Sequence, residues 1–88
     1  MLRATVAIRH KGFLRVVDMS VDPEVLYNYF YYQDRSVINA ARILLGIPAI
    51  SVFRAAVHTE YLIDPRDGRK IPGDCSREKF IRRAEFFL

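Results

Sequence analysis

The chain has 88 residues, which is enough for one hydrophobic core and too few for two. Hydrophobic residues make up 51% of it and only four glycines and four prolines are present, so the composition excludes a disordered segment and leaves apolar surface for a partner. The formal net charge of +4 comes mostly from arginine, and it permits a nucleic acid or an acidic protein as partner without requiring either.

A single cysteine, Cys75, excludes an intramolecular disulfide and a metal site built from several thiolates, as is typical of a reducing compartment. No apolar run approaches the roughly 20 residues that a membrane helix needs, and the first residues lack the apolar segment of a signal peptide. We therefore expect a cytoplasmic protein with no membrane partner.

The N-terminal segment predicts a β-hairpin. Residues 2–9 alternate between two faces with the period of a half-buried strand, and residues 13–19 form a second β-like run. Lys11-Gly12 joins them, and a two-residue connection containing glycine is a hairpin signal.

Two helices are expected next. Asp22 can cap the first helix, Pro23 suits its first position, and residues 33–36 interrupt it. A second helix is predicted from about Val37 to Leu45, where Gly46 can end it. Its apolar stripe consists of Val37, Ile38, Ala41, Leu44 and Leu45.

The remaining chain predicts a second hairpin and a C-terminal helix. Residues 49–63 indicate one long central strand with a bend near Ala55-Ala56, whose shared face holds Phe53, Ala55, Val57, Tyr61 and Ile63. A turn at residues 64–68 returns the chain into a short strand at 69–71. Asp74 or Ser76 then caps a helix with the apolar stripe Phe80, Ile81, Ala84, Phe87 and Leu88.

The predicted fold is a single α+β domain spanning residues 1–88, in the order ββααββα, with a mostly antiparallel sheet packed by helices. Part of this order also occurs in KH RNA-binding domains. Those domains depend on a G-x-x-G loop between two helices, and this chain has Gln33-Asp34-Arg35-Ser36 there. The shared order is therefore no evidence of kinship.

The chain contains no convincing catalytic set. His58 and Glu60 share a strand face ahead of Cys75, but one cysteine leaves a zinc site a ligand short, so we interpret His58 as a surface residue beside a glutamate. The carboxylates Glu60, Asp64 and Asp67 could in principle hold a divalent cation, although aspartates in turns are explained by their own backbone hydrogen bonds. We predict no catalytic residue, metal or cofactor, and rank a metal-dependent hydrolase third.

Two surfaces are candidates for binding. Tyr27, Tyr31 and Tyr32 are expected on the outside of the first helix, where tyrosine is typical of protein interfaces, unless another element of the domain covers them. The leading hypothesis is therefore a non-enzymatic protein-binding module, either a homodimer or a regulator or inhibitor docking on a larger protein. The alternative is nucleic-acid binding through basic residues, which could equally be ordinary solvated charges: Arg35, Arg42, Arg66, Arg69, Lys70, Lys79, Arg82 and Arg83.

Overall fold

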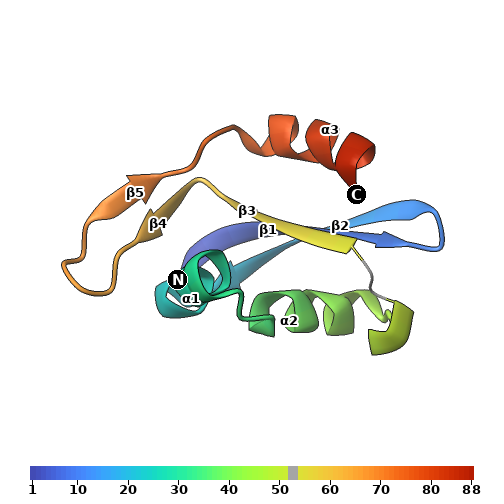
Figure 1. The fold of residues 1–88 in the computed structure, drawn as a ribbon, viewed down its shortest axis with the longest axis horizontal. Coiled ribbons are helices and arrows are strands. Elements are labelled where there is room, and N and C mark those ends of the chain that lie inside the picture. The colour runs from blue at the N-terminus through green and yellow to red at the C-terminus, as the bar shows by residue number, and fades with distance from the viewer. Residues whose placement is uncertain (52–53) are drawn as a thin grey trace.

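The computed structural model describes residues 1–51 and 54–88, and it confirms the predicted α+β fold (Figure 1). The elements in chain order are β1 (Leu2–His10), β2 (Phe13–Val21), α1 (Pro23–Tyr32), α2 (Ser36–Leu45), the 3₁₀ helix η1 (Ala49–Ser51), β3 (Arg54–Thr59), β4 (Tyr61–Ile63), β5 (Lys70–Pro72) and α3 (Arg77–Phe87). Within the described ranges, no helix has the length and apolar character needed to cross a membrane.

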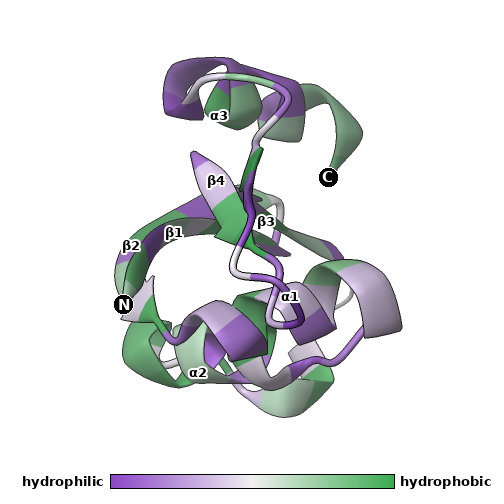
Figure 2. Cartoon of the chain, turned by 90° about the vertical axis from the view of Figure 1, so that its left-hand side faces the viewer, coloured by the Kyte–Doolittle hydropathy of each residue, from purple (hydrophilic) through white to green (hydrophobic). Residues whose placement is uncertain are grey.

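β1 is the centre of a three-stranded antiparallel sheet with the order β2-β1-β3. One face of β1 places Val6 and Ile8 in the core beneath α1 and α2, while α3 covers the other face above Thr5 and Ala7 (Figure 2). Because helices cover both faces of the sheet, β1 is buried on both sides, whereas the sequence pattern predicts a half-buried strand. The prediction of a central strand over residues 49–63 is wrong, because β3 pairs with β1 alone and forms an edge.

Local turn and cap chemistry works as the sequence predicts. Lys11 and Gly12 both have positive φ, 51° and 82°, which is the geometry of a tight hairpin turn that matches strand twist. The Asp22 side chain accepts a hydrogen bond from the backbone N–H of Glu24 at the start of α1, and Gly46 ends α2 with a φ of 70°. These four positions fix the β1–β2 turn, the start of α1 and the end of α2.

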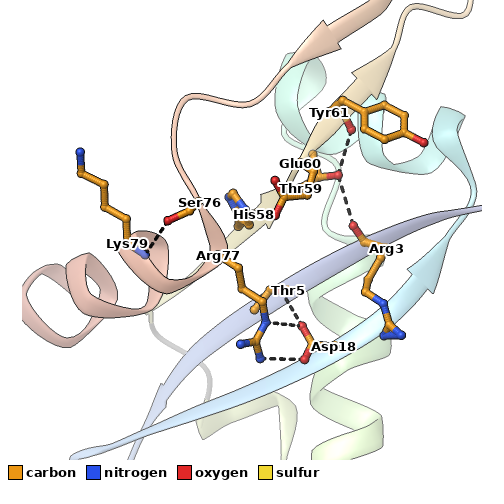
Figure 3. Close-up of polar contacts among 10 residues, drawn as sticks. All are labelled: Arg3, Thr5, Asp18, His58, Thr59, Glu60, Tyr61, Ser76, Arg77 and Lys79. Carbon is orange, nitrogen blue, oxygen red and sulfur yellow. Dashed lines mark hydrogen bonds and ion pairs between the residues drawn. The ribbon is translucent and has the colours of Figure 1, made fainter.

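The predicted long strand is divided at Glu60. β3 ends at Thr59, and β4 turns away to form a separate two-stranded sheet with β5. The Thr59 hydroxyl lies 2.9 Å from the Tyr61 carbonyl oxygen and 3.3 Å from that of Arg3, which ties the bend to β1 (Figure 3). The chain therefore bends later than predicted, and Phe53, which was assigned to the strand face, lies outside the described residues.

α3 lies on the opposite side of the sheet from α1 and α2 (Figures 1 and 2). Ala84 is its one buried residue among those described, and Phe87, which we predicted to face inward, is exposed. Polar contacts at its two ends hold the helix: Arg77 binds the Asp18 carboxylate with two hydrogen bonds of 2.9 and 2.7 Å (Figure 3), and Arg9 reaches the C-terminal carbonyls.

The pair between Arg77 and Asp18 leads to a pH-dependent prediction. Hydrogen bonds from Arg77 and then from the Thr5 hydroxyl hold the pKa of Asp18 below its ordinary value of 3.8. Because the folded-state pKa is the lower one, the stabilisation is complete above about pH 4 and is lost as the pH falls through the folded-state pKa. Asp18→Asn should therefore lower the free energy of unfolding by about 1–2 kcal/mol at pH 7, measured by urea denaturation.

The difference between wild type and Asp18→Asn should shrink as the pH falls below 3.8. Glu78→Gln, which removes an exposed carboxylate from the same turn of α3, is the matched control and should change stability by less than about 0.5 kcal/mol. A difference that stays constant down to pH 2 would show that Asp18 does not stabilise the fold through its charge.

Candidate functional site

Many of the strongly exposed apolar side chains lie on elements at one end of the molecule, although Met1 and Tyr32, which are 82% and 72% exposed, lie elsewhere. The β1–β2 turn, the end of α2, η1 and the end of α3 all lie at that end (Figure 1). Together they carry six large apolar residues that are each 64–88% exposed, which we call the apolar end: Phe13, Ile43, Leu44, Ile50, Phe86 and Phe87. Large exposed apolar patches are typical of interaction sites.

Arg9 joins two parts of the apolar end. Its guanidinium donates to the Gly12 carbonyl in the hairpin turn at 3.3 Å and to the Leu88 carbonyl after α3 at 2.8 Å. The neighbours of these two residues in the chain, Phe13 and Phe87, are thereby brought to the same region. One partly buried arginine therefore connects the segments that carry aromatic residues more than 70 positions apart in sequence.

The charges around the apolar end are mainly positive. Lys11, Arg15 and Arg54 are exposed in the β1–β2 hairpin and at the start of β3. The acidic residue Glu85 is exposed as well, but its carboxylate lies 3.9 Å from the guanidinium of Arg9. The end thus combines apolar side chains with a basic rim.

The tyrosines of α1 are only partly on the surface. Tyr27 is buried, which contradicts the expectation that it lies outside: its ring stacks on that of Tyr31 at 4.3 Å, and Arg66 donates to its hydroxyl at 3.4 Å. Tyr31 is half exposed and Tyr32 is exposed. A partner could therefore touch Tyr31 and Tyr32, whose role in binding stays a prediction.

The predicted nucleic-acid-binding residues do not form one patch. Arg35 directly precedes α2 and Arg42 lies within it, whereas α3 carries its basic residues on the opposite side of the sheet (Figure 1). At least four of the eight have partners within the chain: Arg42 donates to the Ile47 carbonyl, Arg66 donates to the Tyr27 hydroxyl, the Lys70 ammonium lies 4.3 Å from the centre of the Tyr61 ring, and Arg83 lies 3.8 Å from the Asp74 carboxylate. The other members of the set are distributed over the β4–β5 turn, β5 and α3: Arg69 lies in the turn, Lys70 begins β5, and Lys79, Arg82 and Arg83 lie on α3. Nucleic-acid binding through these residues remains an untested prediction.

A cavity of about 500 Å³ lies at the outer edge of β3, where α1 and α3 reach past the two faces of the sheet. Its walls combine aromatic side chains of α1 and α3 with aliphatic side chains of β3, β4 and β5. His58 lines it with a side chain only 5% exposed, stacked on Phe80 at a ring distance of 5.2 Å. Our interpretation of His58 as a surface residue is wrong, because α3 covers this face of β3.

The Nε2 atom of His58 has no hydrogen-bond partner among residues 1–51 and 54–88. The nearest carboxylate oxygen, on Glu60, is 3.7 Å away, which is too long for a hydrogen bond. A buried polar atom without a partner is uncommon in folded proteins and calls for a physical explanation.

The other polar residues of the cavity define its chemistry. Burial, followed by the Asp74 side chain, raises the pKa of the Cys75 thiol, while Arg83 and Lys79 oppose the increase. A thiol shifted in this direction is a poorer nucleophile at neutral pH. Among residues 1–51 and 54–88, no group of three histidine, cysteine or acidic side chains could hold a metal ion.

Sequence reasoning missed both the apolar end and the cavity. Ile43 and Phe86 were the available signals for the first, since both fall outside the predicted apolar stripes of their helices, whereas Leu44 was predicted to face inward and is 64% exposed. The cavity is assembled from residues of five elements, so no local pattern could indicate it. A comparison of the chain with family models, curated proteins and solved structures finds no match.

Proposed function

We propose that this protein is a non-enzymatic binding module that docks through its apolar end into an apolar groove of a larger protein. The observation that carries the proposal is the gathering of six exposed apolar side chains, three of them phenylalanines, at one end of a small domain. Aromatic side chains contribute most of the binding energy in typical protein interfaces, especially where a pocket of the partner excludes water from them.

The basic rim specifies the kind of partner. A symmetric end-to-end dimer would place Lys11, Arg15 and Arg54 of one copy near the same residues of the other, and this repulsion disfavours self-association. A groove rimmed by aspartate and glutamate would complement the rim and accelerate association. We therefore favour a larger acidic protein over a second copy, and we place the interaction in the cytoplasm, which a chain with one free thiol suits.

The test is the double substitution Phe86→Ser with Phe87→Ser. Both side chains are largely exposed, so the variant should keep its free energy of unfolding within about 0.5 kcal/mol of wild type. A partner captured by crosslinking in cells and then purified should bind the variant roughly 30-fold more weakly, as expected for the loss of about 2 kcal/mol at an interface centre. Calorimetry at two salt concentrations should also show weaker binding at the higher one.

Tyr31→Ala with Tyr32→Ala is the matched control, because it removes two exposed aromatic residues of α1 and leaves the apolar end intact. Its affinity for the same partner should equal that of wild type. Loss of binding in the tyrosine variant together with full binding in the phenylalanine variant would overturn the proposal and return the interface to α1. A stable dimer of wild type that the phenylalanine variant cannot form would instead make the partner a second copy.

A further inference from the structure

The cavity at the edge of β3 is separate from the apolar end and does not depend on the function proposed above. Its volume of about 500 Å³ falls within the range of sites that enclose a small organic molecule, roughly 300–1,000 Å³. Such sites are typically lined by apolar and aromatic side chains with a few polar groups that fix orientation. The walls here have this composition.

Aromatic side chains enter the wall from both helices that reach the cavity. Phe30 and Tyr31 come from α1, and Phe80 comes from α3, where its ring is held against His58. Flat rings pack well against such side chains in offset or edge-on arrangements. The cavity is therefore better suited to an aromatic group than to a branched aliphatic one.

The polar groups favour a negative charge on the ligand. Arg83 lines the cavity, and its nearest acidic partner is Asp74, whose carboxylate oxygen lies 3.8 Å from a guanidinium nitrogen. Both side chains are well exposed, and an exposed pair at this distance contributes little stability, so Arg83 can turn to another anion at small cost. Outside the lining, Lys79 lies close enough to influence Cys75, and the exposed Glu60 carboxylate lies 3.7 Å from His58 Nε2. Arg83 is therefore the cation of the wall itself that can receive an anion.

We propose that this cavity binds a small aromatic carboxylate, with its ring against Phe30, Tyr31 and Phe80 and its anionic group at Arg83. A ligand oxygen that reaches the imidazole would also supply a hydrogen-bond partner for His58 Nε2, which has none in the part of the chain that the structure describes. A side chain of a partner protein is a less suitable occupant, because no single protein side chain carries both an aromatic ring and a carboxylate.

Indole-3-acetate is the probe, and tryptophol, which has the same ring and a neutral hydroxyl, is its matched analogue. Binding is measured by titration of the ¹⁵N-labelled full chain and by calorimetry. A ligand of this size with ordinary efficiency should bind with a Kd of about 1 mM or tighter. Tryptophol should bind at least about tenfold more weakly, which corresponds to the loss of one charge-assisted contact.

Two variants locate the site. Arg83→Gln should weaken indole-3-acetate about tenfold and leave tryptophol unaffected, whereas Arg82→Gln, which removes the neighbouring exposed charge outside the cavity wall, should change neither. Saturating indole-3-acetate should also slow the alkylation of Cys75, the sole thiol, by N-ethylmaleimide. This second readout does not depend on any substitution being tolerated.

The proposal is overturned if no binding is detected up to about 10 mM probe, which is beyond the affinity that such a ligand should reach. It is equally overturned if both probes bind alike, if Arg83→Gln has no effect, or if the shifted amides lie away from the cavity. Failure here leaves the docking proposal standing, since Phe86 and Phe87 take no part in the cavity.

Discussion

Gly73→Ala is expected to lower the free energy of unfolding by about 2–3 kcal/mol. A Cβ atom at this position would lie 2.5 Å from the carbonyl oxygen of Thr59 and 3.2 Å from that of Glu60. These oxygens belong to the backbone, so neither can rotate away as a flexible side chain would. The backbone N–H of Gly73 also donates to the Glu60 carbonyl at 2.8 Å, and this bond would stretch if the segments moved apart.

Gly73 holds the segment before α3 against the bend between β3 and β4. Its substitution should therefore disturb both β5 and the start of α3. Urea denaturation gives the stability, and amide exchange should show faster opening in β5 and the first turn of α3 than in β1. Asp74→Ala is the matched control, because this neighbouring side chain is exposed and its loss should cost less than about 0.5 kcal/mol. Equal stability of wild type and Gly73→Ala would mean that the bend can relax freely.

The sequence was sufficient for features that are decided within a few residues. The turn at Lys11-Gly12, the cap at Asp22 and the end of α2 at Gly46 follow from backbone φ preferences and from short hydrogen bonds, which are local properties. The order of the elements could be predicted because these signals separate one element from the next.

Features that depend on distant contacts could not be predicted. The division at Glu60 depends on the Thr59 hydroxyl and on the approach of Gly73, which comes 13 residues later. Gly73 lies in a turn-like sequence, Pro72-Gly73, that gives no sign of a close approach by another backbone segment. β3 likewise has a normal strand pattern, and its position at the edge reflects pairing with β1 alone.

The candidate sites were harder to predict than the fold, because burial depends on which element covers which face. The period of α1 places Tyr27 away from the core stripe, yet Tyr31 stacks over it and Arg66 reaches its hydroxyl. The strand period likewise placed His58 on a solvated face, which α3 in fact covers. In both cases the covering residues are supplied by the tertiary arrangement.

Arg9→Ala is expected to release α3 from the sheet. The guanidinium of Arg9 donates to the carbonyl oxygens of Leu88 at 2.8 Å and Glu85 at 3.1 Å, and thus satisfies acceptors that the end of a helix leaves free. The positive charge also lies at the negative end of the helix dipole. Among the described residues, α3 buries little apolar surface, so these hydrogen bonds contribute much of the free energy that holds it on the sheet. Their loss should lower the free energy of opening α3 by about 2 kcal/mol.

A cost of this size corresponds to an opening of α3 about 30-fold more frequent, which amide exchange of Ala84 and Phe87 can measure against that of Val6 in β1. Arg9→Lys should recover only part of the loss, because an ammonium keeps the charge but cannot span the carbonyls that the planar guanidinium reaches together. Arg54→Ala is the control: Arg54 faces Arg9 across the β1–β3 pair, so its removal relieves a like-charge contact and should leave α3 as firmly held or more so. If the amides of α3 still exchange slowly in Arg9→Ala, then Arg77 and the stacked pair of His58 and Phe80 suffice to hold the helix. The phenylalanines of the apolar end would then not depend on Arg9 for their position.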